Sequence, residues 1–118
     1  MKIHKVLLSF ALVISFCSCQ LMKSETSIYI STEGSDINPG TKQKPLKTLV
    51  AARDFVRFKR AAKPKLRDQE IKIILRKGSY VLDETLVLEP VDSNIIFKTY
   101  QDEIASIVGG RQINGWET

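Results

Sequence analysis

The side chains that most often carry out catalysis are scarce in this sequence and lie near its start. The single histidine is His4, and the two cysteines are Cys17 and Cys19. Beyond residue 19 the chain therefore excludes a Ser-His-Asp triad, a Cys-His nucleophile pair, a histidine zinc site and an intramolecular disulfide. We expect no metal and no cofactor, so any chemistry rests on carboxylates, cations and aromatic rings.

The first residues predict an export signal. Lys2 and Lys5 precede an uncharged, mostly apolar run over residues 6–18. A membrane-spanning helix needs about 20 apolar residues, so this run is too short to be one. A positive start followed by an apolar stretch of this size is typical of a secretory signal peptide. A buried N-terminal core helix is the alternative.

The end of this run resembles the lipobox of bacterial lipoprotein signal peptides. Ser18 fits the small position before the cysteine, Cys19 fits the lipidated position, and Phe16 stands where leucine is usual. The resemblance implies a signal peptide at residues 1–18 and a tether at 19–27 that joins a membrane lipid to the fold. No aspartate follows Cys19, which favours the outer membrane, on its periplasmic or surface face. Cleavage by an ordinary signal peptidase near Ser18 is the alternative.

The chain is basic, with 18 Lys+Arg against 13 Asp+Glu and a net charge of +5. With 43% hydrophobic and 26% charged residues it is neither disordered nor collagen-like by composition. A basic stripe either binds phosphate or an acidic polymer or forms one solvated helix face. Because we expect export from the cytoplasm, we expect no nucleic-acid partner. The stripe comprises Arg53, Arg57, Lys59, Arg60, Lys63, Lys65 and Arg67.

Short apolar runs separated by turn residues predict a largely β chain. A loop rich in turn residues follows the first run. In it Asp36, Asn38 and Gly40 partly match a calcium loop, but the bidentate glutamate of such a loop is missing, so a self-stabilised turn is favoured. The expected strands are 28–31, 71–76, 80–82, 85–88, 95–100 and 105–108.

An amphipathic helix is predicted over residues 49–62. Thr48 is a suitable N-cap, and Pro64 ends the helix. Arg53 and the other basic residues of the stripe are expected to face water. The apolar positions recur at three- and four-residue spacing, as Leu49, Ala52, Phe55 and Val56.

Two types of strand recur at one period. The apolar residues 73–75 are followed by 95–97, and Val87 is followed by Val108, both after slightly more than twenty residues. A period of this length is typical of a solenoid, in which each coil covers the open edge of the coil before. A meander of antiparallel hairpins is the alternative.

An ordered set of short motifs resembles the N-terminal region of secreted bacterial right-handed parallel β-helix proteins. The resemblance implies a mostly β, pectin lyase-like fold. A cap at 28–67 would hold a strand, an Asn-Pro-Gly turn and a helix, and 68–118 would form the first, incomplete coils. The motifs are Gly34-x-Asp36-x-Asn38-Pro39-Gly40-Thr41, Lys44-Pro45-Leu46-x-Thr48-Leu49, Arg76-Lys77-Gly78-Ser79-Tyr80 and Gly109-Gly110-Arg111-x-Ile113-x-Gly115-Trp116.

Proteins of this kind are mostly large glycoside hydrolases and some polysaccharide lyases, whose catalytic acids project from later coils. The resemblance therefore implies the amino-terminal portion of a longer, lipid-anchored carbohydrate-active protein, most simply a glycoside hydrolase acting on complex polysaccharide. We expect this portion to be inactive alone and to have a structural capping role. Two alternatives stay open: a non-enzymatic β-helix surface protein (an adhesin or glycan binder), and a small independent lipoprotein.

The resemblance directs attention to carboxylates, because glycoside hydrolysis uses two of them on either side of the scissile bond. Neighbouring residues of a doublet project apart and corner aspartates bond their own backbone, so we expect no catalytic residue here. A lyase would need a base, for which Arg76 or Lys98 is available, and Tyr100 and Trp116 are candidates for stacking on sugar rings. The carboxylates considered are Asp83, Glu84, Asp92, Asp102 and Glu103.

Overall fold

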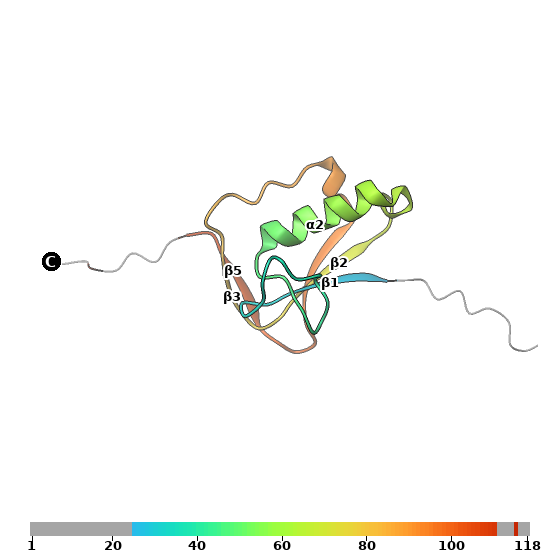
Figure 1. The fold of residues 1–118 in the computed structure, drawn as a ribbon. Helices are drawn as coiled ribbons and strands as arrows, with labels where there is room; N and C mark the ends of the chain where they lie inside the picture. Colours follow the sequence, from blue (N-terminus) through green and yellow to red (C-terminus); the bar gives the residue numbers. More distant parts are fainter. Residues whose placement is uncertain (1–24, 111–114, 116–118) are drawn as a thin grey trace, which may run out of the picture.

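The computed structural model describes residues 25–110 and residue 115 (Figure 1). The predicted signal peptide, Cys19 and Trp116 lie outside the described residues. The elements are β1 (Thr26–Ile30), α2 (Leu49–Ala62), the 3₁₀ helix η1 (Pro64–Leu66), β2 (Ile71–Leu75), β3 (Gly78–Val81), the 3₁₀ helix η2 (Pro90–Asp92), β4 (Ile95–Thr99) and β5 (Ala105–Val108).

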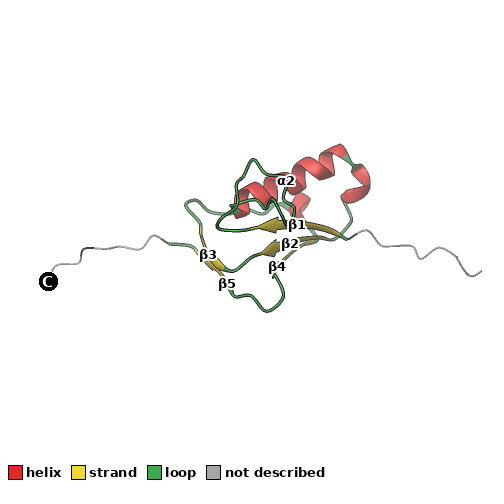
Figure 2. Ribbon diagram, turned by 60° about the horizontal axis from the view of Figure 1, so that its bottom comes forward, coloured by secondary structure: helices red, strands yellow, loops and turns green. Residues whose placement is uncertain are grey.

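The strands form two parallel sheets, one of three strands in the order β1-β2-β4 and one of two strands, β3 and β5. Figure 2 shows β1, β2 and β4 stacked in this order, with α2 at the β1 end. In the first sheet Ile28, Ile73 and Phe97 lie in one row across the strands. All described pairings are parallel, so the antiparallel meander is wrong.

The core lies between the inner face of the three-stranded sheet and the apolar side of α2. Alternate residues of β1 and β2 point into it, because side chains along a strand alternate between the two faces. Val56 is fully buried, which confirms that this side of the helix packs against the first strands. The buried cluster consists of Ile28, Ile30, Leu46, Leu49, Ala52, Val56, Ile71, Ile73, Leu75 and Tyr80.

The predicted helix at residues 49–62 is confirmed at both ends. Thr48 is its N-cap, and the Thr48 hydroxyl accepts a hydrogen bond of 3.1 Å from the amide of Ala51. Asp36 accepts hydrogen bonds from the amides of Lys47 and Thr48, each 2.9 Å. Asp36 lies in a turn, but its carboxylate does not stabilise that turn as expected; it joins the loop after β1 to the start of α2.

The segment 40–46 runs along the outer edge of β1 and pairs with it. The amide of Tyr29 donates to the carbonyl of Gly40 at 2.8 Å, and the amide of Leu46 donates to the carbonyl of Tyr29 at 2.9 Å. Gly40 has a φ of 75°, a left-handed conformation that favours glycine. Because these bonds use the outer backbone groups of Tyr29, no further strand can pair there.

Two expectations about the strands were wrong. Residues 85–88 are not a strand; they belong to an extended segment that runs beside α2. The partner of Val108 is Val81, not Val87, and Ile95 lies opposite Ile71 instead of Ile73. Backbone pairing and the contacts of α2 decide both features, and neither can be read from the spacing of apolar residues.

The opposite end of the stack is open in the described part of the chain. β4 and β5 each have a strand partner on one side alone. Ile107 and Val108, both in β5, are 50% and 39% exposed. Within residues 25–110, α2 and the two 3₁₀ helices are all too short or too polar to cross a membrane.

Candidate functional site

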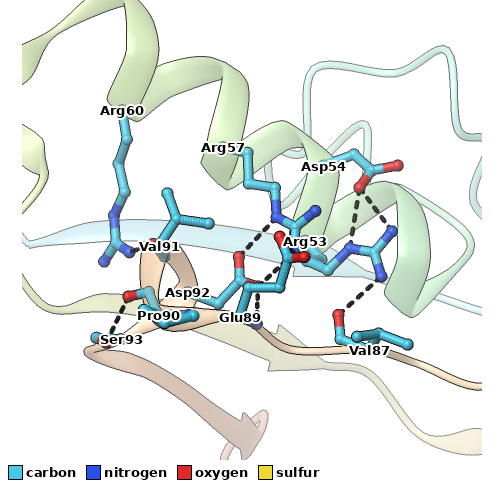
Figure 3. A network of polar contacts seen from close by, with 10 residues as sticks. All are labelled: Arg53, Asp54, Arg57, Arg60, Val87, Glu89, Pro90, Val91, Asp92 and Ser93. Atoms are coloured by element: carbon cyan, nitrogen blue, oxygen red, sulfur yellow. Dashed lines mark hydrogen bonds and ion pairs between the residues drawn. The ribbon is translucent and has the colours of Figure 1, made fainter.

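The arginines of α2 bind the segment at residues 85–93, which we call the strap (Figure 3). Arg53 donates from Nη1 to the carbonyl of Val87 at 3.0 Å, and Arg60 donates from Nη1 to the carbonyl of Val91 at 2.6 Å. Arg60 is 1% exposed. The expectation that the stripe faces water was wrong for the three arginines of α2, because carbonyl oxygens of the strap and the carboxylate of Asp92 replace water as acceptors. The later members of the stripe are exposed as expected: Lys63, Lys65 and Arg67.

Asp92 is the carboxylate at the centre of this contact. It accepts from Nε of Arg57 at 2.9 Å and from the amide of Glu89 at 2.8 Å, and its side chain is 1% exposed. The hydrogen bond from Arg57, more than any other contact, keeps the pKa of Asp92 below its ordinary value. A general acid for glycoside hydrolysis needs the opposite shift, so Asp92 is suited to an ion pair.

The other carboxylates considered from the sequence lie in three different environments. Glu103 accepts a hydrogen bond of 2.5 Å from Nε of Arg76, and this bond keeps the pKa of Glu103 below its ordinary value. Asp83 and Glu84 line an open groove of about 400 Å³ beside the start of α2. Asp102 is exposed in the turn before β5. The structure thus pairs two of these carboxylates with arginines instead of with each other.

The sequence suggested two candidates for the base of a lyase, Arg76 and Lys98, and the structure places them in different environments. The hydrogen bond to Glu103 raises the pKa of Arg76, which therefore stays protonated and cannot act as a base. Lys98 is exposed in β4, on the face of the sheet that points away from the core.

Tyr100 lies in a group of aromatic and basic side chains, which we call the tyrosine cluster: Tyr29, Lys42, Arg76, Tyr100 and Glu103. The rings of Tyr29 and Tyr100 are 6.3 Å apart at an angle of 59°. Over the Tyr100 ring, the guanidinium carbon of Arg76 lies 4.5 Å from the centroid and Nζ of Lys42 lies 4.9 Å from it. These are cation–π distances.

The sheet register places this cluster. Tyr29 of β1, Ile74 of β2 and Lys98 of β4 occupy one row, on the face opposite the core. Just beyond the strands the amide of Arg76 donates to Ile30 at 2.9 Å, and the amide of Tyr100 donates to Leu75 at 3.0 Å. The parallel pairing therefore continues for one more residue and brings Arg76 and Tyr100 onto the same face as Tyr29.

Sequence reasoning identified Tyr100 but missed two of its neighbours. Tyr29 alternates with the buried Ile28 and Ile30, and this alternation indicates an outward side chain. Lys42 carries no such signal, because the loop that brings it to Tyr100 is placed by its contacts with β1. The described residues contain no group of three or more histidine, cysteine or acidic side chains placed to bind a metal ion.

Comparison with known proteins gives one informative match. No protein-family model matches the chain, and no curated protein does. A solved structure named "Glycoside hydrolase" is 31% identical, with a TM-score of 0.66 over 79% of this chain. The match covers 16% of that protein, so the chain spans less than a fifth of its length. At this identity and fold similarity, the chain is related to part of a protein named as a glycoside hydrolase.

Proposed function

We propose that the chain is the amino-terminal cap and the first coils of a right-handed parallel β-helix, in a lipid-anchored carbohydrate-active protein that is most simply a glycoside hydrolase. The observation that carries the proposal is the difference between the two ends of the strand stack. One end is covered by segments of the chain itself, and the other presents strand edges that have no partner within residues 25–110. In this proposal the described residues have a structural capping role.

The covered end has the features that a cap requires. An uncapped first strand exposes backbone groups that pair with other chains, and an uncapped interior exposes apolar side chains. Segment 40–46 occupies the edge of β1, and α2 buries Leu49, Ala52 and Val56 over the interior. Both exposures are removed within the described residues.

The open end has the features that a following coil requires. Phe97 and Ile95 pack against the core from one side and are partly exposed on the other. Ile107 continues the row of the buried Tyr80 and is half exposed. A further coil on β4 and β5 would bury these side chains and pair the free edges of both strands.

The comparison supports a carbohydrate-active parent. The glycoside hydrolase that resembles this chain is several times longer than the matched region. In the described part of this chain, Asp92 and Glu103 form ion pairs with arginines. We propose that catalytic carboxylates and most polysaccharide contacts belong to other coils, and that the tyrosine cluster contributes a glycan contact.

Anchoring completes the proposal. Cys19, preceded by the small Ser18 and an apolar run, would carry the lipid. Residues between Cys19 and β1 would then form a short tether. We propose an outer-membrane location, in which the cap lies close to the lipid and later coils extend toward polysaccharide.

The capping role is tested by placing a charge on α2 at a buried or an exposed position. Val56→Asp puts a carboxylate among buried apolar side chains and should lower the free energy of unfolding by about 3 kcal/mol or more. It should also cause association, because loss of the helix exposes the strand edges. Light scattering and thermal melting of the full chain measure both effects.

The matched control is Phe58→Asp, which introduces the same residue two positions further along the helix. Phe58 is 69% exposed, so this change should alter the free energy of unfolding by no more than about 0.5 kcal/mol. Equal melting temperatures and equal association for the two variants would show that α2 does not cap the stack.

A further inference from the structure

The end of α2 and the 3₁₀ helix η1 carry cations that the fold does not pair. Between Asp54 and Asp68 the sequence has no acidic residue. The arginines of α2 in this stretch bind the strap, but Lys63, Lys65 and Arg67 are exposed. Within residues 25–110, no carboxylate lies within ion-pair distance of these three side chains, which we call the basic end.

The basic end lies beside the start of β1. Thr26, the first residue of that strand, lines an open hollow together with Ala62, Lys63 and Lys65. Figures 1 and 2 both show the start of β1 and the end of α2 at the same end of the molecule. From Cys19 to Thr26 the chain advances by seven residues. Seven residues span at most about 25 Å even when fully extended, so a lipid on Cys19 would hold the basic end near the membrane surface.

An exposed aromatic side chain adjoins the basic end. Phe58 lies in α2 on the side away from the core and is largely exposed. Ala62 is one turn further along the helix, is also exposed, and lies in the hollow with the two lysines. Cations beside an exposed aromatic ring are typical of protein surfaces that lie in the headgroup region of a membrane.

The acidic side chains of this region lie to one side of the basic end. Asp68 and Glu70 line a neighbouring hollow that also contains Lys72 and Glu25. Lys72 forms an ion pair of 3.0 Å with Glu25, so this hollow has a cation of its own. The surface formed by η1 and the last turn of α2 therefore keeps its positive charge, which fits an anionic partner.

We propose that the basic end docks on anionic phospholipid headgroups of the membrane that holds the chain. Lys63, Lys65 and Arg67 would contact the phosphates, and Phe58 would enter the headgroup region beside them. The proposal rests on the anchoring part of the proposed function and adds a second contact to it. Because a tether alone lets the cap rotate freely, this contact would fix the orientation of the strand stack relative to the membrane.

Amide hydrogen exchange of the full chain in vesicles tests the proposal. In vesicles with about one-third phosphatidylglycerol, exchange over residues 61–70 should be at least about threefold slower than in vesicles of phosphatidylcholine alone. Raising the salt concentration to about 0.5 M should remove most of this difference, because the contact is electrostatic. Equal exchange in the two kinds of vesicle would overturn the proposal.

Two triple variants locate the contact. Replacing all three cations of the basic end by glutamine should abolish the difference between the vesicles. The matched control makes the same change at Lys42, Lys44 and Lys47, which are exposed near the opposite end of α2, and should keep the difference. Both variants retain the tether, so an effect of the membrane on local pH applies equally to both. An equal loss in the two variants would overturn the assignment, and circular dichroism checks that each is folded.

Inorganic phosphate separates a lipid surface from a site for free phosphate. Phosphate added to the chain in a non-ionic detergent, at the concentration of the lipid phosphate, should leave exchange over residues 61–70 unchanged. Equal slowing by free phosphate would contradict docking on a membrane. The lipid on Cys19 is tested separately by labelling and the capping role by Val56→Asp, so failure of this proposal is distinguishable from failure of the proposed function.

Discussion

Asp92 is the residue on which the contact between α2 and the strap depends most. Its carboxylate accepts from the guanidinium of Arg57 and from the amide of Glu89. The first bond attaches the strap to the helix, and the second fixes the turn at η2. Because the carboxylate is buried, replacing it by an amide leaves one oxygen to accept and places an NH2 group against a donor, either the Arg57 guanidinium or the Glu89 amide.

Asp92→Asn should lower the free energy of unfolding by about 1 to 2 kcal/mol at pH 7. The pKa of Asp92 is lowered in the folded state, so its stabilising effect is full above the unfolded pKa of about 4 and is lost as the pH falls through the folded pKa. The difference between the variant and the unmodified chain should therefore shrink below pH 4. Urea unfolding at pH 7 and at pH 3 measures it.

Asp102→Asn is the control for this pH dependence. Asp102 is exposed, and its change should leave the free energy of unfolding within about 0.5 kcal/mol at both pH values. A difference between Asp92→Asn and the unmodified chain that stays constant from pH 7 to pH 3 would contradict the role of the Asp92 charge.

Gly34 is the second residue whose identity is required by its surroundings. A Cβ atom at this position would lie 2.6 Å from the carbonyl oxygen of Pro45 and closer still to that of Leu46. Gly34→Ala should therefore lower the free energy of unfolding by about 1 to 3 kcal/mol. Gly110→Ala, where no atom lies within 4 Å, should change it far less. Thermal melting compares the two, and equal melting temperatures would contradict the close approach.

At the scale of elements, the loop after β1 and the start of α2 form one unit. Asp36 accepts from the amides of Lys47 and Thr48 and from the Thr48 hydroxyl, the last at 3.0 Å. The same loop places segment 40–46 against the edge of β1. Asp36 therefore links the position of the first turn of α2 to the packing of segment 40–46 against β1.

Asp36→Ala removes this coupling and should lower the free energy of unfolding by about 1 to 2 kcal/mol, because three donors lose their acceptor. Amide hydrogen exchange should rise at Lys47 and Thr48 and along residues 40–46. Asp68→Ala, at an exposed position outside this loop, is the control. Unchanged exchange at Tyr29 and Leu46 in Asp36→Ala would show that the loop and the strand edge are not coupled.

The strap is an element without regular strand or helix over most of its length. Its carbonyl groups at Val87 and Val91 accept from Arg53 and Arg60, and these bonds take the place of a ladder to another strand. A strand predicted from apolar composition is thus replaced by an extended segment bound through side chains. The planar guanidinium group suits this role because it presents several donors in a fixed geometry.

At the scale of the whole molecule, the two ends of the strand stack differ in what they can bind. The β1 end is occupied by α2 and by segment 40–46, so neither a further coil nor a second copy can add there. The edges of β4 and β5 are unpaired within the described residues. In the β-helix that we propose, further coils would therefore add at the end opposite to the tether.

This polarity agrees with a lipid at Cys19, and the lipid can be tested directly. Labelled palmitate should enter the unmodified chain during bacterial expression and should be absent from Cys19→Ser. Cys17→Ser is the control and should keep the label, because Phe16 would then precede the modified cysteine at a position that needs a small residue. Label that survives in Cys19→Ser would contradict lipidation at this residue.

The sequence by itself determined the elements whose causes are local. The helix at 49–62 follows from apolar spacing, the Thr48 cap and Pro64, each of which acts within a few residues. The strands at 71–75, 95–99 and 105–108 follow from β-branched runs between turns. The placing of Leu49, Ala52 and Val56 in the core was predictable for the same reason.

Only the tertiary structure decided which strands pair and which partners the charged side chains contact. Register depends on backbone pairs between residues far apart in sequence, so spacing alone gave Val108 the wrong partner. Apolar composition alone likewise predicted a strand at 85–88 that the structure does not contain. The partners of Arg57 and Tyr100 also lie on distant segments. The arginines of α2 were therefore predicted to face water, because their acceptors in the strap are brought close by folding alone. The cations that contact Tyr100 could not be predicted for the same reason.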